Sequence, residues 1–472
     1  MKSVLLAIEI DTQFVELLRV ARLLKESGEY KPILWFQSSY CAIERDLAIC
    51  QSEGWEYISP LPVSVTSQKE NNKKIGFFIS IRTSFRSMGQ RIVQSIPFFK
   101  FPINTMLYVC HYILLVRQIK HHLVKIRPHL LIMAEDSSQH GLYILIKLGN
   151  ASGIPTVIIP FTIANATEPA EAYFDKHEYI VSDNPVNRFI GSHFSHWVYC
   201  YKGRKLLRMP AWNIIALELL GFAPRQPWIY NSEETSLIAV ENEQMFQYYR
   251  NEGLPADRLI ITGALYDDIL TEGIRNAETN RAALNKELNL NPNQPLLVCA
   301  LPPSQFPRNC EFPDYPELVR FWMQTLTTIK GWNIIIRPHP RLGKEDLDFL
   351  QQFTLKLTQI DTASLVPLCD IYVASVSATI RWAIACGKPV INYDVYNMNY
   401  SDYVDAGGVI TINDKESFRD TLWNLTSNPE YYNHMITHQQ ECMSKWGHLD
   451  GKSGERMLRL FNEVIQNSKE RR

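Results

Sequence analysis

The sequence lacks several features that would point to a particular class of protein. Its 472 residues hold 48 Lys and Arg against 49 Asp and Glu, and the net charge of −1 gives no sign of a nucleic-acid partner. The 9 cysteines are dispersed, with no Cys-x-x-Cys pair and no Cys/His cluster at metal-binding spacing. We therefore expect reduced thiols in a cytoplasmic protein, with no metal and no cofactor.

Long apolar runs are scarce as well. The run Val4–Ile8 ends at Glu9, which is too early for the apolar part of a secretory signal. The most apolar later segment, Ile103–Val116, is too short to span a bilayer. We expect a cytoplasmic protein, with the inner face of the cytoplasmic membrane as an alternative location.

What is present is an alternation of short apolar runs and segments with helical periodicity. A chain of this length is expected to form two or three domains. The alternation predicts α/β architecture with parallel, doubly wound sheets. Strands are expected at 4–10, 32–36, 57–58, 130–134, 156–160, 236–240 and 259–262, and a second sheet is expected to start at 296–301.

Two segments interrupt this rhythm. From Lys69 to Arg127 there are eleven Lys or Arg and one acid, Glu70, and phenylalanines lie among them. For 77–101 two interpretations stay open: a basic aromatic surface for an anionic membrane or acceptor, or helices with solvated charges. For 103–116 we favour a helix packed on the sheet. The second segment, 165–230, is rich in His, Trp and Tyr and is predicted to be an irregular insertion.

Two short motifs follow predicted strands in the second half of the chain, and we expect these two strand ends to be consecutive. Arg337-Pro338-His339-Pro340 ends the apolar run 332–336, and Ser375-Val376-Ser377-Ala378-Thr379 joins the run 371–374 to a predicted helix. Arg offers a planar fork of donors, and a helix start offers N–H groups and a favourable dipole. Together the motifs predict a phosphate-binding site. For the hydroxyls alone, simple helix capping is the alternative.

A pair of acids, Glu135-Asp136, follows the predicted strand 130–134. Acids at the carboxyl end of a parallel strand lie where such sheets bind ligands. The alternative is that Asp136 caps the next helix. The acid pairs Asp267-Asp268 and Glu345-Asp346 fall at predicted helix starts, which does not indicate a metal site.

The motifs at 337–340 and 375–379 resemble the HP and S-S/T motifs of GT-B glycosyltransferases. The resemblance extends to bacterial sialyltransferases and polysialyltransferases, capsule-polysaccharide transferases and CDP-glycerol glycerophosphotransferases. Glu135-Asp136-Ser137 is similar to the acidic motif of the sialyltransferases, with Ser137 in place of its Gly. The layout from Val240 to Gly263, with the closing helix at 454–465, also resembles the UDP-N-acetylglucosamine 2-epimerases, which share the fold.

The resemblance implies two Rossmann-like domains that face a cleft. Segment 1–275 would form the N-terminal, acceptor-side domain, with insertions near 64–127 and 165–230. Segment 290–446 would bind the nucleotide sugar, and 447–472 would be a helix that crosses back. Asp136, Glu135 and His339 would be catalytic, the second acid serving as the general base. The donor would bind at Arg337, His339, Ser375, Ser377, Ala378, Thr379, Ser304 and Gly263.

The function implied is metal-independent transfer of a sugar from a CMP-, UDP- or CDP-linked donor to a glycan or glycolipid acceptor of a bacterial surface polysaccharide. Two alternatives stay open. One is epimerisation of a nucleotide sugar, which needs carboxylates but no acceptor. The other is nucleotide-sugar binding without catalysis. Peripheral membrane contact would run through 77–101.

Overall fold

The computed structural model describes residues 1–37, 43–59, 100–137, 141–161, 163, 165–304, 310–340, 342–399 and 402–470. The predicted basic aromatic surface at 77–101 therefore lies almost entirely outside the described residues. Within the described part, none of the helices combines the length and the apolar character that crossing a bilayer requires.

The chain folds into two compact units, each assembled from separate stretches of sequence. The first comprises 1–238, 254–258 and 458–472, and the second comprises 239–253 and 259–457. The sequence boundaries predicted at 275, 290 and 446 stay predictions, because compactness alone does not define a domain boundary.

A seven-stranded sheet has the order β3-β2-β1-β4-β5-β8-β9, and the pairs from β3 to β8 that the register defines are parallel. Residues 4–8 of β1 and all of β4 are fully buried, as expected for parallel strands covered on both faces. The strands are β1 (Lys2–Ile8), β2 (Tyr30–Phe36), β3 (Tyr57–Ile58), β4 (Leu130–Met133), β5 (Thr156–Ile158), β8 (Leu237–Val240) and β9 (Leu259–Ile261).

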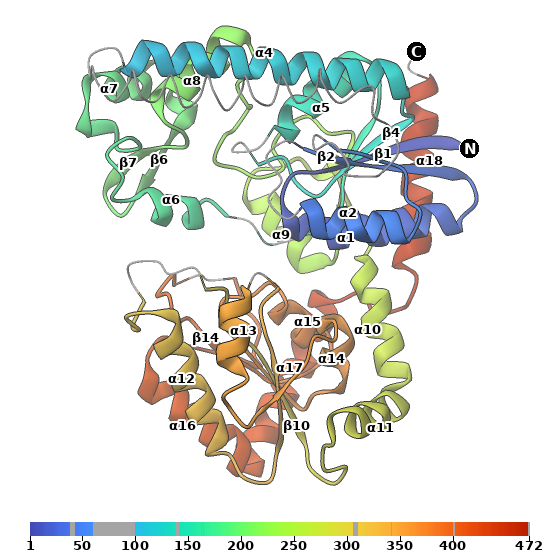
Figure 1. The fold of residues 1–472 in the computed structure, drawn as a ribbon, viewed down its shortest axis with the longest axis vertical. Coiled ribbons are helices and arrows are strands. Elements are labelled where there is room, and N and C mark those ends of the chain that lie inside the picture. The colour runs from blue at the N-terminus through green and yellow to red at the C-terminus, as the bar shows by residue number, and fades with distance from the viewer. Residues whose placement is uncertain are drawn as a thin grey trace. The chain divides into compact units, whose positions relative to one another are not determined.

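Helices cover both faces of this sheet. Figure 1 shows α1 (Asp11–Glu26) and α2 (Ile43–Ser52) on one face and α4 (Lys100–Ile126) and α5 (Leu142–Ala151) on the other. Helix α4 is longer than the segment 103–116 that we expected to be helical.

The segment 165–230 is more regular than predicted. Its antiparallel hairpin of β6 (Val198–Tyr201) and β7 (Arg204–Leu207) lies among helices and has its own small core around Tyr173 and Trp228. The helices are α6 (Thr167–Tyr173), η2 (Val181–Asp183), α7 (Pro185–His193), η3 (Ser195–Trp197) and α8 (Ala211–Leu220). The hairpin was missed because its apolar residues barely alternate along two four-residue strands.

The second unit contains a six-stranded, fully parallel sheet with the order β12-β11-β10-β13-β14-β15. In Figure 1, α12 (Tyr315–Thr327) and α16 (Lys415–Ser427) lie on one face, and α14 (Thr362–Leu365) and α15 (Ile380–Ala385) lie on the other. The strands are β10 (Leu296–Ala300), β11 (Asn333–Arg337), β12 (Lys356–Leu357), β13 (Ile371–Ala374), β14 (Val390–Tyr393) and β15 (Val409–Ile412).

Aromatic stacking fixes α12 and α16 on this sheet. The indole of Trp322 stacks on the ring of Tyr393 with the centroids 5.7 Å apart, and Phe418 stacks on Tyr393 at 4.8 Å. The other helices of this part of the chain are α9 (Glu243–Asn251), η4 (Ala256–Arg258), α10 (Leu265–Arg275), α11 (Ala277–Leu288), α13 (Lys344–Leu350), η5 (Val366–Leu368), α17 (Pro429–Trp446) and α18 (Ser453–Glu470).

Candidate functional site

The six-stranded sheet has its topological switch point between β10 and β13. From β10 the chain moves outward to β11 on one side, and β13 then returns to the other side of β10. Ligands of open parallel sheets bind outside the carboxyl ends of the strands at such a point. Ser304 follows β10 and Ser375 follows β13, so the structure places both predicted residues beside the switch point.

The turn after β13 has an unusual backbone. Val376 has a φ of 43°, in the left-handed region that a β-branched residue rarely adopts. Its N–H donates to Asn392 Oδ1 at 2.8 Å, and Asn392 Nδ2 donates to Thr411 Oγ1 at 3.2 Å. Asn392 lies in β14 and Thr411 in β15, so two neighbouring strands hold the turn in a conformation that costs on the order of 1–3 kcal/mol.

The hydroxyls of this motif form a small network. Thr379 Oγ1 lies 2.6 Å from the Tyr372 hydroxyl and 2.8 Å from Ser377 Oγ. The Tyr403 hydroxyl donates to the carbonyl of Ser377 at 2.8 Å. Ser375 Oγ is buried and has no hydrogen-bond partner among the described residues. A buried hydroxyl without a partner is costly, which marks this position for a polar ligand atom.

Ala378 and Thr379 lead directly into α15, and a buried ion pair holds this helix in place. Arg381 in α15 pairs with Glu241, and both side chains are almost completely buried. Glu241 follows β8 in the segment whose layout resembles the epimerases. The ion pair therefore fixes the position of α15, while the charge of Arg381 is already neutralised and is not offered to a ligand.

Arg337 is partly engaged in holding its own strand end. Its Nε donates to the carbonyl of Ile360 at 2.8 Å, and its NH1 donates to the carbonyl of Pro338 at 2.5 Å. Burial lowers the pKa of Arg337. His339 is half-buried in the turn beyond β11, where its carbonyl accepts from the N–H of Leu342 at 3.0 Å.

β10 separates the two predicted motifs in the sheet. We expected them on consecutive strand ends, and they are consecutive neither in the sheet nor, because of β12, along the chain. Both motifs still lie at the same edge of the sheet, because all six strands are parallel and their carboxyl ends lie together. Ser304, at the end of β10, lies between the strand ends that carry His339 and Ser375.

Gly263 belongs to a different structural group. It has a φ of 76°, and a Cβ there would overlap Ser453 Oγ and lie 3.0 Å from Ser453 Cβ. Asp268 accepts from the N–H groups of Ser453 and Gly454 at 2.9 and 2.8 Å, which caps the start of α18. Gly263 therefore allows α18 to start close to α10, a packing role that accounts for it without a ligand.

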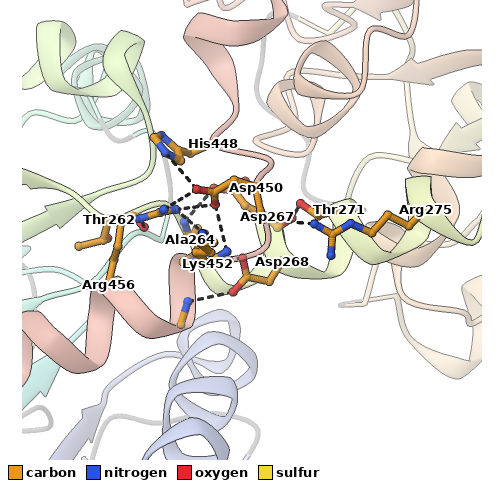
Figure 2. Close-up of polar contacts among 12 residues, drawn as sticks. Thr262, Ala264, Asp267, Asp268, Thr271, Arg275, His448, Asp450, Lys452 and Arg456 are labelled. Carbon is orange, nitrogen blue, oxygen red and sulfur yellow. Dashed lines mark hydrogen bonds and ion pairs between the residues drawn. The ribbon is translucent and has the colours of Figure 1, made fainter.

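A polar network surrounds this helix start (Figure 2). Arg456 donates through Nε to the carbonyl of Thr262 at 2.7 Å and through NH1 and NH2 to Asp450 at 2.7 and 3.1 Å. The hydrogen bonds from Arg456 lower the pKa of Asp450 to about 2. Asp267 caps α10 by accepting from the N–H of Ala264 at 2.8 Å. The acid pair 267–268 thus serves two helix starts.

The seven-stranded sheet has its own switch point, between β1 and β4. Glu9 follows β1 and Glu135 follows β4, so two carboxylates flank it. Gln13 in α1 links the backbone of Glu9 to the carboxylate of Glu135. Its Oε1 accepts from the N–H of Glu9 at 2.9 Å, and its Nε2 donates to Glu135 Oε1 at 3.0 Å. Glu9 Oε1 in turn accepts from the N–H of Gly141 at 2.8 Å.

Asp136 has a different environment from its neighbour. Its Oδ1 accepts from the N–H of Asn231 at 2.5 Å, and its Oδ2 accepts from the N–H of Glu233 at 2.8 Å. Both carboxylate oxygens therefore hold the loop 231–233 within the same unit. Glu135, with one oxygen held by Gln13, is the better placed of the two acids to exchange a proton.

Burial raises the pKa of Glu135 to about 7, although the hydrogen bond from Gln13 acts in the opposite direction. Burial also raises the pKa of Asp136 to about 7, against the hydrogen bonds from Glu233 and Asn231. A carboxyl group with a pKa near neutrality can accept and return a proton at physiological pH. Burial at this edge of the sheet thus brings the pKa of both acids close to neutrality.

Sequence reasoning missed Glu9, Gln13 and Asn392 as parts of these sites. Each follows or lies on a predicted element, yet its partner is far away in the sequence, as with Gln13 and Glu135. It also missed Arg208, which is buried and donates to the hydroxyls of Tyr173 and Tyr230 at 3.2 and 3.3 Å. Only the order of strands in the sheet and the fold of 165–230 bring these groups together. Among the described residues, no group of three or more His, Cys, Asp or Glu could hold a metal ion.

No family model matches the sequence, and no curated protein matches it. Solved structures do match. The UDP-GlcNAc 2-epimerase of Neisseria meningitidis, bound to UDP-GlcNAc, has a TM-score of 0.54 and 11% sequence identity, and the match covers 98% of this chain and 100% of the epimerase. The calicheamicin glycosyltransferase CalG4 has a TM-score of 0.52 at 12% identity over 99% and 98% of the two chains.

The structure of S. aureus MnaA with UDP matches with a TM-score of 0.53 and 10% identity over 99% of this chain and 97% of that chain. At such identities the likeness concerns the fold. It agrees with the two parallel sheets. The chain has the GT-B fold shared by glycosyltransferases and UDP-GlcNAc 2-epimerases.

Proposed function

We propose that the protein is a glycosyltransferase that moves a sugar from a nucleotide-linked donor to a glycan or glycolipid acceptor of a bacterial surface polysaccharide. The observation that carries the proposal is the strained turn at the β10–β13 switch point. There Val376 is held at a φ of 43° beside Ser375, whose buried Oγ has no partner among the described residues. Strain and unsatisfied polar atoms are retained where a ligand compensates for them.

In this proposal the second unit binds the donor. Ser375 Oγ and Ser377 Oγ hydrogen-bond to phosphate oxygens, and His339 donates to the phosphate that leaves. The UDP-GlcNAc bound by the N. meningitidis epimerase makes UDP-linked sugars the first donors to test, with CMP- and CDP-linked sugars next. Selection among these donors would lie in contacts to the base and the sugar, because all of them share the phosphate.

The first unit supplies the base. The carboxylate of Glu135 takes the proton of an acceptor hydroxyl as that oxygen bonds to the anomeric carbon of the donor sugar. The bond from the anomeric carbon to the phosphate oxygen breaks, and the nucleotide leaves with the electron pair. Asp136 holds the loop 231–233 and orients the backbone next to Glu135. Hydrogen bonds that strengthen on the departing phosphate lower the barrier.

Donor binding is tested by thermal shift with CMP, CDP, UDP and GDP, because a ligand that binds only the folded state raises the melting temperature. We expect one nucleotide to stabilise the wild type and to lose that effect in Ser375→Ala and His339→Ala. Ser427→Ala, in the hydroxyl-capped last turn of α16, is the matched control. If all four nucleotides leave the melting temperature unchanged, the donor site is assigned wrongly.

Transfer is distinguished from epimerisation by omitting the acceptor. A UDP-sugar incubated with the protein alone should come back unchanged apart from slow hydrolysis, because a transferase needs a second substrate. The appearance of a new epimer in the NMR spectrum of the sugar would favour the epimerase alternative, to which the fold is equally suited.

A further inference from the structure

A groove of about 700 Å³ lies in the first unit at the opposite edge of its sheet from Glu135. It is formed by the end of α4, the turn before β4, the end of α5 and the end of α18. Strands β1 and β4 are parallel, and His129, in the groove, directly precedes β4, whereas Glu135 follows it. The groove is therefore separate from the proposed catalytic edge.

The groove has an apolar floor and a basic rim. Leu123, Leu148 and Ile465 are buried in its floor. On the rim the exposed side chains include Lys120 and Lys469, together with Arg127 and His129. None of the described residues that line the groove is Asp or Glu. The charge of the rim is thus complementary to an anion, while the floor is suited to hydrocarbon rather than to a free ion.

One face of α4 extends this character away from the groove. Met106, Leu114 and Val124 are 68%, 59% and 69% exposed. At 100° per residue, Val124 returns to the direction of Met106 after five turns, and Leu114 lies within about 80° of both. Arg117 and Lys120 are exposed on the same face. Over a length of about 27 Å this face carries exposed apolar side chains, with Arg117 and Lys120 between Leu114 and Val124.

We propose that this groove and the adjoining face of α4 bind the surface of a membrane rich in anionic phospholipid. The rim cations contact the phosphate of a headgroup, and Met106, Leu114 and Val124 enter the boundary between headgroups and acyl chains. The two signals together are what stable attachment of a peripheral protein requires. The surface lies elsewhere than 77–101 and does not depend on the proposed transferase activity.

The test is flotation of the full-length protein with vesicles of phosphatidylglycerol and, separately, of phosphatidylcholine. We expect binding to phosphatidylglycerol that weakens as salt increases, and little binding to phosphatidylcholine. Each basic residue near an anionic surface contributes about fivefold, so Lys120→Glu combined with Lys469→Glu should weaken binding by at least about 25-fold. Lys286→Glu with Lys445→Glu, equally exposed in the second unit, should leave it unchanged.

A second variant tests the apolar part. Leu114→Asp replaces an exposed side chain, so it should fold normally, as its melting temperature will show, and should lose vesicle binding at high salt. Equal binding to both lipids, or wild-type binding by the Lys120/Lys469 variant, would overturn the proposal. A third outcome would also overturn the proposal: millimolar inorganic phosphate stabilises the wild type but not the Lys120/Lys469 variant, and the wild type does not bind vesicles. The ligand of the groove would then be a soluble anion and not a membrane.

Discussion

Asn392 accepts the backbone N–H of Val376 at 2.8 Å and thereby holds a β-branched residue in the left-handed region of backbone space. The two residues lie on neighbouring strand ends, β14 and β13. The contact shapes the turn before any ligand arrives, and preorganisation of this kind reduces the entropy that binding must overcome.

Replacing Val376 with Gly should separate stability from binding. The φ of 43° then costs nothing, and relief of 1–3 kcal/mol of strain exceeds the entropic cost of glycine, so we expect the free energy of unfolding to rise by up to about 2 kcal/mol. Nucleotide affinity should fall by roughly tenfold, or about 1.4 kcal/mol, because glycine gives the free turn more conformations that binding must restrict, even though its N–H can still donate to Asn392. Denaturant unfolding and calorimetric titration measure the two effects.

Asn289→Gly is the matched control for that variant. Asn289 also has a positive φ, of 52°, where it ends α11 in the same unit. We expect a smaller gain in stability, because Asn tolerates the left-handed region better than Val does, and no effect on nucleotide affinity. Wild-type affinity in Val376→Gly would show that the strained turn has no part in binding.

Glu135→Gln should lower kcat by about 10²- to 10⁴-fold, the usual range for loss of a general base. The wild-type rate should increase with pH through about 7, because only the carboxylate of Glu135 can accept a proton. Gln13→Leu should move this limb to higher pH, since the hydrogen bond from Gln13 lowers the pKa of Glu135. A pH–rate profile that does not change in Gln13→Leu would refute the assignment.

Asp136→Asn should act on stability first. One atom of the amide would be an NH2 group that meets the N–H of Asn231 or Glu233 in place of an acceptor. Leaving such a buried group unsatisfied costs about 1–3 kcal/mol. We expect that loss in urea unfolding, whereas Glu135→Gln should be close to the wild type. A larger loss of stability in Glu135→Gln than in Asp136→Asn would contradict the role of Asp136 in holding the loop 231–233.

Asp267 should make stability depend on pH. Burial raises its pKa from 3.8 to about 8 in the folded protein, so between these values the folded state holds a proton that the unfolded state has lost. The contribution is complete below about pH 4 and disappears as the pH rises through 8, with a slope of at most about 1.4 kcal/mol per pH unit. Asp267→Asn should reduce the measured slope by this amount, and the part that comes from the raised pKa values of Glu135 and Asp136 should stay. Exposed Asp348→Asn should leave the slope unchanged.

Gly263→Ala tests whether that glycine is needed for packing. The new Cβ would overlap Ser453 Oγ, and the φ of 76° disfavours alanine, so we expect a loss of about 2–3 kcal/mol. Ser453→Gly should restore part of it in the double variant by removing the obstructing side chain. If the folded Gly263→Ala variant binds nucleotide more weakly than the wild type, Gly263 would also take part in donor binding, as the sequence predicted.

The sequence predicted where helices and strands lie along the chain better than it predicted which of them are adjacent in space. Predicted strand ends at Arg337 and Ala374 agree with β11 and β13, because short apolar runs bounded by polar turns identify buried strands. The position of β10 between them depends on strand order, which periodicity does not contain. For the same reason the Gln13–Glu135 contact, 122 residues apart, could not be foreseen. The hydroxyl motif was visible, but its support by Asn392 was not.

The last helix has a consequence for the synthesis of this protein. Lys2 Nζ and the Tyr30 hydroxyl both donate to Asn462 Oδ1, at 2.6 and 2.7 Å, so the first strands of the chain contact some of its last residues. Phe461 and Ile465 on the same helix are buried. A ribosome delivers these residues only after both sheets have been made. The first unit must therefore wait, with part of its apolar surface uncovered, until α18 has been translated.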